Sequence, residues 1–226
     1  MSDQFQGKTV VITGANGRLG QQVVRAFAER GATIALVTPT EAEAYDVALP
    51  EGADAWGFPC DATDEGAVTQ CFEAMRAQFG AVDVLVHTVG GWSSSPLADT
   101  TVDDWRRMMD LNLTSTFLAF RAAAGLMTGE GRLIAIASGQ GADKGVAEQA
   151  AYSAAKAGVV RLVEAVASEY DGRITAHAVA PSTLLADGQE GQGVAASTIA
   201  DLIVHLSGSA GAALNGQTIR AYGSAG

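Results

Sequence analysis

The sequence predicts an α/β fold, in which helices cover both faces of one doubly wound, mostly parallel sheet of seven strands. Three observations predict it. Short, uninterrupted apolar runs, which are typical of strands buried on both faces, alternate with longer segments of helical periodicity. A glycine-rich turn joins the first apolar run to the first helical segment. Finally, the 226 residues contain no linker or internal repeat, so residues 1–226 are assigned to a single domain with a sizeable core.

The first half of the chain is expected to hold four strands, over residues 9–13, 33–37, 55–59 and 82–89. Helices are predicted over 21–30, 64–79 and 102–127, and the segment 39–52 is a short, weakly helical crossover. Gly31 closes the first helix, and Asp64 is the expected N-cap of the second. Each helix therefore returns the chain to the start of a new parallel strand.

The second half continues the alternation, with strands expected over 132–137, 174–179 and 217–222. An alanine-rich, proline-free helix is predicted over 149–168, and a shorter helix over 197–206. Between the last two strands the residues 182–196 form a loop rich in glycine and alanine.

Composition excludes several classes of protein. The formal charge is −11 and the isoelectric point is near 4.6, which argues against nucleic acid and anionic membranes as partners. No apolar run is long enough to span a membrane, and the N-terminus lacks the pattern of a signal peptide. Cys60 and Cys71 have neither the spacing of metal ligands nor that of a disulfide framework, so no metal site is predicted. The expected location is the cytoplasm.

Residues 9–37, with the order strand, glycine-rich turn, helix and strand, have the pattern of a dinucleotide-binding unit of the Rossmann type. The turn reads Gly14-Ala15-Asn16-Gly17-Arg18-Leu19-Gly20. Its glycines let the backbone approach a pyrophosphate, and the following helix offers amide donors and the positive end of its dipole. An ordinary tight turn is the alternative interpretation.

Tyr152 and Lys156 lie on one face of the helix predicted over 149–168, because residues four positions apart are one turn apart. The pKa of a phenol is near ~10 in water, and a neighbouring cation lowers it. The pair could therefore act as a general acid and base. Taken alone, it could equally be a packed tyrosine beside a solvated lysine.

Ligands of doubly wound sheets bind beyond the carboxyl ends of the strands. In addition to the glycine-rich turn, those ends carry Thr38, Asp61, residues 88–90, Ser138 and residues 181–183. Together with Tyr152-x-x-x-Lys156 and with Leu111-Asn112 in the long helix, this set resembles the short-chain dehydrogenase/reductase family. The resemblance covers nearly the whole chain.

The resemblance implies a role for each of these residues. Tyr152 would exchange a proton with the substrate oxygen, and Ser138 would hydrogen-bond that oxygen. Lys156 would hold the nicotinamide ribose and lower the pKa of Tyr152, while Asn112 would position a water that links Lys156 to solvent. Asp61 would hydrogen-bond the adenine edge. The cofactor-binding residues implied in this way are Gly14, Asn16, Gly17, Arg18, Leu19, Gly20, Thr38, Asp61, Ala62, Thr88, Val89, Gly90, Tyr152, Lys156, Pro181, Thr183 and Leu184.

Three sites depart from the usual family pattern. Arg18 replaces the middle glycine, His87-Thr88-Val89-Gly90 stands in place of Asn-Asn-Ala-Gly, and Pro181-Ser182 in place of Pro-Gly. The glycine spacing, Gly90-Gly91-Trp92 and Pro181-x-Thr183-Leu184 resemble dihydropteridine reductases, although that subgroup lacks a catalytic serine at the position of Ser138. The leading interpretation is an NAD(P)-dependent carbonyl reductase or alcohol dehydrogenase. Reduction of a pterin and non-catalytic sensing of a dinucleotide are the alternatives.

Cofactor preference depends on the end of the second strand, where enzymes that use NAD usually carry an acidic residue. That position is Thr38, and the carboxylates of Glu41 and Glu43 are expected to lie too far along the chain. Arg18 could bind a 2′-phosphate through two hydrogen bonds, with Thr38 and Thr40 adding hydroxyl donors. The sequence therefore favours NADP(H) and leaves NAD(H) possible, as dihydropteridine reductases favour NADH.

The expected partner is a small carbonyl or alcohol substrate. Because residues 182–196 and those after Gly91 carry few charges, a mostly uncharged substrate is predicted. Family resemblance implies a homo-oligomer, a tetramer or dimer, which pairs through the helices that contain Asn112 and Tyr152. Small residues at the predicted interface are Ala150, Ala151, Ala154, Ala155, Ala157 and Gly158.

Overall fold

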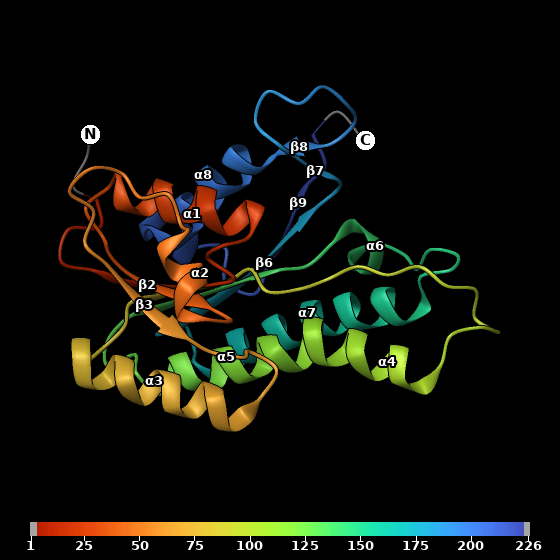
Figure 1. The fold of residues 1–226 in the computed structure, drawn as a ribbon, viewed down its shortest axis with the longest axis horizontal. Helices are drawn as coiled ribbons and strands as arrows, with labels where there is room; N and C mark the ends of the chain where they lie inside the picture. Colours follow the sequence, from red (N-terminus) through yellow and green to blue (C-terminus); the bar gives the residue numbers. More distant parts are fainter. Residues whose placement is uncertain (1–3, 224–226) are drawn as a thin grey trace.

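A seven-stranded parallel sheet forms the centre of the protein in a computed structural model that describes residues 4–223 (Figure 1). The first three and last three residues of the domain predicted over 1–226 lie outside this part. The strand order is β3-β2-β1-β4-β5-β6-β9, so the direction of winding reverses between β1 and β4. The strands are β1 (Thr9–Thr13), β2 (Thr33–Thr38), β3 (Ala55–Pro59), β4 (Val84–His87), β5 (Gly131–Ile136), β6 (Ile174–Pro181) and β9 (Thr218–Ala221).

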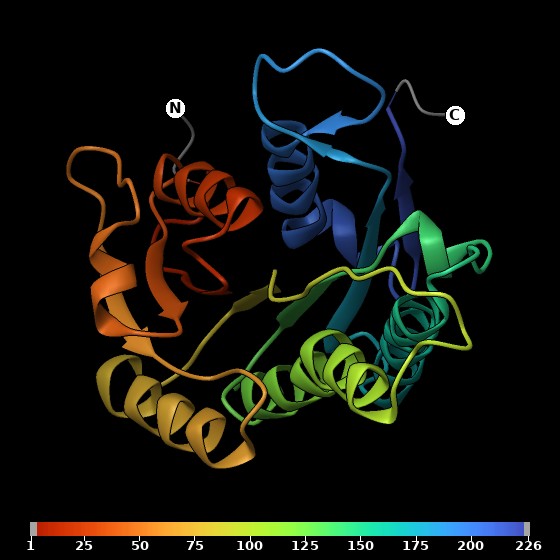
Figure 2. The same ribbon diagram turned by 45° about the vertical axis from the view of Figure 1, so that its right-hand side comes forward.

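Helices cover both faces of this sheet, as predicted. On one face lie α1 (Arg18–Ala28) and α8 (Ala196–Ser207), and on the other α3 (Glu65–Phe79), α5 (Ser115–Ala124) and α7 (Ala150–Glu169) (Figure 1 and Figure 2). Successive strand residues point to opposite faces, so Val10 and Ile12 of β1 pack with α1 and α8, whereas Val11 packs with α3, α5 and α7. The predicted fold class is therefore confirmed.

Several boundaries differ from the prediction. The helix predicted over 102–127 consists of α4 (Val102–Met109), one π-helical segment (Asp110–Thr114) and α5. The fourth strand is shorter than 82–89, because β4 pairs with β1 only through Val84–His87. The short helices α6 (Gly139–Ala142) and α9 (Ser209–Ala212) were not predicted. The short helix α2 (Glu41–Tyr45) lies in the segment 39–52, which was expected to be only weakly helical.

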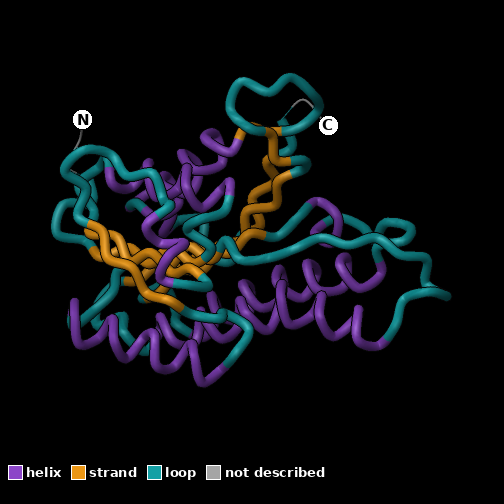
Figure 3. Tube along the Cα trace, viewed as in Figure 1, coloured by secondary structure: helices purple, strands orange, loops and turns teal. Residues whose placement is uncertain are grey.

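The segment after β6 is more ordered than the loop predicted over 182–196. It contains a short ladder of β7 (Leu184–Leu185) with β8 (Val194–Ala195), and the stretch between them projects from the body of the molecule (Figure 3). Val194 N–H donates to Thr183 O, which closes the base of this projection. The ladder lies beyond the carboxyl end of β6, where the sequence predicted a substrate-binding segment.

Candidate active site

The glycine-rich turn between β1 and α1 is tightly closed on itself. Gly14 has a φ of +69°, and a Cβ at Gly20 would lie 2.0 Å from Gly14 O. Thr88, at the end of β4, ties the turn to the sheet through a hydrogen bond from Oγ1 to Thr13 O (2.7 Å). Helix α1 begins at Arg18, and its N-cap has no side-chain hydrogen bond, so the first amide groups and the positive dipole end remain free for an anion. This cradle fits the pyrophosphate of a dinucleotide.

The side chains around this turn are arranged differently from the prediction. Asn16 Nδ2 donates to Glu43 Oε2, so the carboxylate of Glu43 lies at the turn and the expectation that it is too distant was wrong. The hydroxyl of Thr38 donates to Thr40 O (2.8 Å), and the Thr40 hydroxyl donates to Glu43 Oε1 (3.2 Å). Neither hydroxyl proton is therefore free for a phosphate in this structure.

Arg18 extends across the crevice. Its Nη1 donates to Leu184 O of β7 at 3.0 Å, which directs the guanidinium toward the end of β6 and away from the end of β2. A 2′-phosphate would be bound near the end of β2 in a unit of this type. The guanidinium is thus not placed where the NADP(H) prediction needs it.

Asp61, which follows β3, carries an exposed carboxylate. Its Oδ1 accepts hydrogen bonds from the Thr63 hydroxyl (2.7 Å) and backbone N–H (2.9 Å), and both bonds lower its pKa. The residue thus fixes the turn that leads into α3, whose N-cap Asp64 accepts from Ala67 N–H (2.6 Å). Because both Thr63 bonds go to Oδ1, the other carboxylate oxygen can still accept from a ligand.

The catalytic candidates meet at the start of α7. Ser138 follows β5 and accepts a hydrogen bond from Gln140 N–H (3.2 Å). Burial raises the pKa of the Tyr152 phenol, and the neighbouring Ser138 hydroxyl partly opposes this rise. Lys156 is 5% exposed, and its Nζ donates to Ile136 O at 2.7 Å. Burial lowers its pKa to about 8. The Lys156 ammonium is therefore directed at the backbone in this structure. The group that partly opposes the rise in the Tyr152 pKa is Ser138, and not Lys156 as the family resemblance implied.

Asn112 lies in the π-helical segment and is fully buried. Its side-chain amide exchanges two hydrogen bonds with the backbone of Gly91, at 3.0 and 3.1 Å, and also donates to Met108 O. A Cβ at Gly90 would lie 2.9 Å from Asn112 Oδ1 and 3.2 Å from Lys156 Nζ. The amide thus fixes the Gly90–Gly91 backbone directly beside Lys156, a local role that is typical of π-helical turns at functional sites.

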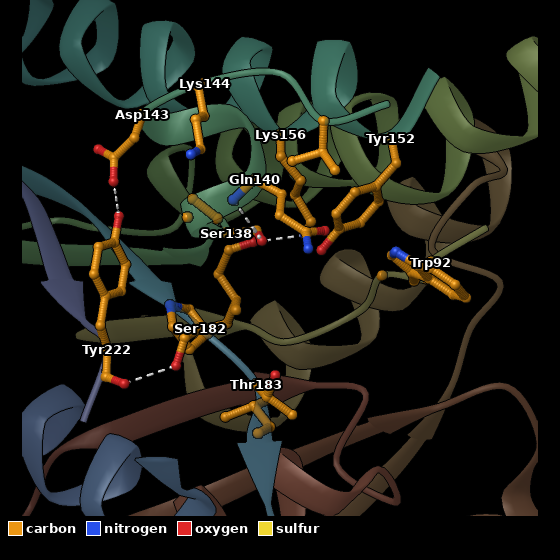
Figure 4. Close-up of a pocket in the computed structure, with 18 of the residues that line it drawn as sticks. Trp92, Ser138, Gln140, Asp143, Lys144, Tyr152, Lys156, Ser182, Thr183 and Tyr222 are labelled. Carbon is orange, nitrogen blue, oxygen red and sulfur yellow. Dashed lines mark hydrogen bonds between the residues drawn. The ribbon is translucent and has the colours of Figure 1, made fainter. Parts of the chain in front are cut away.

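These groups open into a cavity of about 870 Å³ at the carboxyl ends of β4, β5 and β6 (Figure 4). Of the predicted site residues, the cavity brings together Thr88, Gly90, Ser138, Tyr152, Lys156, Pro181, Thr183 and Leu184. The predicted residues of the glycine-rich turn, with Thr38, Asp61, Ala62 and Val89, lie outside its lining. Lining residues that were not among the predicted site residues include Trp92, Gln140, Asp143, Lys144 and Tyr222.

The described part of the chain, residues 4–223, holds no group of three or more His, Cys, Asp or Glu residues suited to a metal ion. None of its helices has both the length and the apolar character needed to cross a bilayer. Both cysteines are free and buried, Cys60 after β3 and Cys71 in α3.

Known proteins resemble this chain in sequence and in structure. The sequence model of the short chain dehydrogenases matches residues 8–193. D-threitol dehydrogenase of Mycolicibacterium smegmatis is 32% identical over 190 residues, which cover 81% of this chain and 73% of that protein. Cis-4-hydroxycyclohexanecarboxylate dehydrogenase of Sinomonas cyclohexanicum is 36% identical over 188 residues, or 80% and 75% of the two chains.

A solved dehydrogenase/reductase from Sinorhizobium meliloti 1021 superimposes with a TM-score of 0.88 at 27% identity, and the match covers 99% of this chain and 97% of the other. The glycine-rich cradle and the open amide groups of α1 are the parts of the site that suit a dinucleotide. This chain therefore belongs to the short-chain dehydrogenase family, and it is an NAD(P)-dependent oxidoreductase.

Proposed function

We propose that the protein interconverts a secondary alcohol and its ketone, with Tyr152 as the general acid and base. The observation that carries the proposal is that Tyr152 and Ser138 line the same cavity, with Lys156 buried one helical turn away. When bound, a nicotinamide cofactor supplies the hydride chemistry. Both relatives described above are named as dehydrogenases of hydroxyl compounds, which supports this reaction class.

In the proposed mechanism the side chains divide the work. Ser138 donates to or accepts from the substrate oxygen and keeps the Tyr152 hydroxyl directed at it. Burial favours the protonated phenol, which suits proton donation to a ketone. Lys156 would hold the cofactor ribose, and Asp61 the adenine edge. Asn112 would hold the Gly90–Gly91 backbone in place beside Lys156. It would also position a water that links Lys156 to solvent.

Removal of the Tyr152 hydroxyl is the direct test. Tyr152→Phe should lower turnover of ketones by about 100-fold or more, because proton transfer is lost, and should leave cofactor affinity nearly unchanged. Tyr45→Phe is a matched control, since Tyr45 is exposed on α2 and its hydroxyl donates to Glu41. Turnover by Tyr152→Phe at the wild-type rate would overturn the assignment.

Pterin reduction is kept as a second candidate because of Trp92. Its side chain is 59% exposed and lines the cavity, where it could stack on a flat ring. A panel of ketones and a quinonoid pterin, followed by nicotinamide absorbance, separates these activities. The third candidate, a dinucleotide sensor, predicts tight cofactor binding without turnover of any substrate, although binding alone would not need Tyr152 and Ser138 in one cavity.

For the cofactor, the sequence favoured NADP(H), but two contacts support NAD(H). Arg18 bonds Leu184 instead of approaching the end of β2, and the Glu43 carboxylate at the turn would repel a 2′-phosphate. We therefore propose a preference for NADH over NADPH. Glu43→Gln should reduce this preference, and Glu41→Gln on the same short helix is the control. A wild-type preference for NADPH that Arg18→Ala abolishes would instead support the sequence-based prediction.

Oligomerisation through α4, α5 and α7 is also a proposal. Val102 and Trp105 on α4 and Phe117 on α5 are large, exposed apolar residues, which supports an interface there. Among the small residues of α7, however, Ala151 and Ala155 face the core, and Gly158 packs on Leu113 of the same chain. A dimer or tetramer mass by light scattering is expected at micromolar concentration, and a monomer mass would contradict it.

A further inference from the structure

A positive charge in the cavity has no role in the reaction proposed above. The chain has a formal charge of −11 and contains three lysines, yet two of them, Lys144 and Lys156, line this one cavity. The remaining charged residue of the lining is Asp143. Because Lys156 belongs to the catalytic group, Lys144 is the cation that needs an explanation.

Asp143 is occupied by other partners. Its Oδ1 accepts from Arg220 Nε at 2.6 Å, and its Oδ2 accepts from the Tyr222 hydroxyl (Figure 4). The charge of Asp143 is thus balanced by Arg220 of β9. Across residues 4–223 Lys144 forms no ion pair, whereas the exposed Lys8 is paired with Asp83. The ammonium of Lys144 is therefore free to meet an anionic ligand.

The loop that carries Lys144 is held from two sides. Gly141 has a φ of +128°, and a Cβ there would lie 2.8 Å from Lys156 Cβ and 2.9 Å from Ser153 O, so the backbone packs directly on α7. Gly141 N–H also donates to Lys144 O at 3.0 Å. In Figure 4, Lys144 extends from this loop on one side of Ser138 and Tyr152, and Trp92 lies on the other. The cation is thus presented at a fixed side of the cavity, remote from Trp92.

We infer that Lys144 binds a carboxylate that the substrate carries at the end remote from its reacting oxygen. The substrate class is then a hydroxy acid or keto acid in which several atoms separate the two groups. This inference rests on the proposed function, because it names the substrate of the same site. It replaces the mostly uncharged substrate predicted from residues 182–196 and those after Gly91, which do not include the loop 139–144.

Binding of a matched pair of ligands tests the inference without requiring turnover. We expect wild-type enzyme, saturated with cofactor, to bind cyclohexanecarboxylate about fivefold more tightly than the isosteric cyclohexanecarboxamide in calorimetry, as one exposed ion pair allows. Lys144→Met should abolish the preference, whereas Lys144→Arg and the control Lys8→Met should retain it. The preference should also shrink as salt is raised. Equal binding of both ligands to wild type, or a preference that survives in Lys144→Met, would overturn the inference.

Turnover separates this inference from the proposed function. With 4-oxocyclohexanecarboxylate and its carboxamide as substrates, Lys144→Met should raise the KM for the acid about fivefold with little change in kcat. If wild type reduces neither ketone but still prefers the carboxylate in calorimetry, the proposed function fails and the inference stands. If both ketones are reduced with equal kcat/KM, the inference fails and the proposed function stands.

Discussion

The glycine-rich turn of residues 14–20 and the loop of residues 139–144 both lie at the carboxyl edge of the sheet, and both depend on glycine, but they are held by different kinds of contact. In the turn, a Cβ at Gly20 would strike Gly14 O, six positions earlier. In the loop, a Cβ at Gly141 would strike Ser153 and Lys156 of α7, and Asp143 reaches Arg220 of β9. The turn thus closes on its own backbone and is tied to the sheet by Thr88, whereas the loop packs on α7 and reaches β9.

The largest effect is expected where the turn is closed. Gly20→Ala should lower the free energy of unfolding by about 3 kcal/mol, because backbone atoms on both sides of the new methyl group must move. It should also abolish cofactor binding. Urea denaturation and cofactor titration measure the two effects. Gly129→Ala is the control, since a Cβ at Gly129 has no neighbour within 4 Å. Equal stability of the two variants would contradict the packing argument.

A smaller loss with a different signature is expected in the loop. Gly141→Ala should cost about 2 kcal/mol, from overpacking against α7 and from an alanine at a φ that favours glycine. Turnover should fall about tenfold or more, because Ser138 directly precedes this loop, whereas cofactor affinity should stay within about twofold of wild type. Gly145→Ala is the nearby control, because a Cβ at Gly145 would make only an ordinary contact with Ser153 Cβ, at 4.0 Å. If cofactor affinity fell as far as turnover, the two regions would not act separately.

The pH dependence of catalysis tests the contact at the base of the loop. Because burial raises the Tyr152 pKa, alcohol oxidation, which needs the phenolate, should increase as pH rises through the alkaline range, and ketone reduction should decrease there. Ser138→Ala removes the hydroxyl that lowers this pKa, so both profiles should move to higher pH. Profiles of kcat/KM in the two directions provide the measurement, and a shift to lower pH would contradict the assignment.

The smallest effect is expected at the contact between the loop and β9. Asp143→Asn removes the charge that pairs with Arg220, and the KM for an uncharged ketone such as 4-oxocyclohexanecarboxamide should rise only about twofold to threefold, as is usual for an exposed ion pair. Asp103→Asn is the control, because Asp103 forms a comparable exposed pair with Arg106 away from the cavity. A loss of stability as large as that of Gly141→Ala would show that the ion pair, and not the packing on α7, holds the loop.

Local patterns in the sequence were sufficient for the parallel sheet, the order of strands and helices, the cradle at Gly14–Gly20, and the pairing of Tyr152 with Lys156 on one helix. Each of these depends on residues close together in the chain, through strand burial, helical periodicity or turn geometry. The place of Ser138 in one crevice with Thr88 and Pro181 was also anticipated, because the carboxyl ends of parallel strands share one edge of the sheet.

The tertiary structure alone decided which distant residues meet. It brought Glu43 to Asn16, directed Arg18 to Leu184 and turned the Asn112 amide onto Gly91. It also joined Asp143 to β9 and left Lys144 open in the cavity. Such contacts depend on how whole elements pack and how loops close, and no local spacing in the chain encodes them. For that reason the catalytic candidates could be named from the sequence, while the proposals on cofactor preference and substrate charge depend on the folded chain.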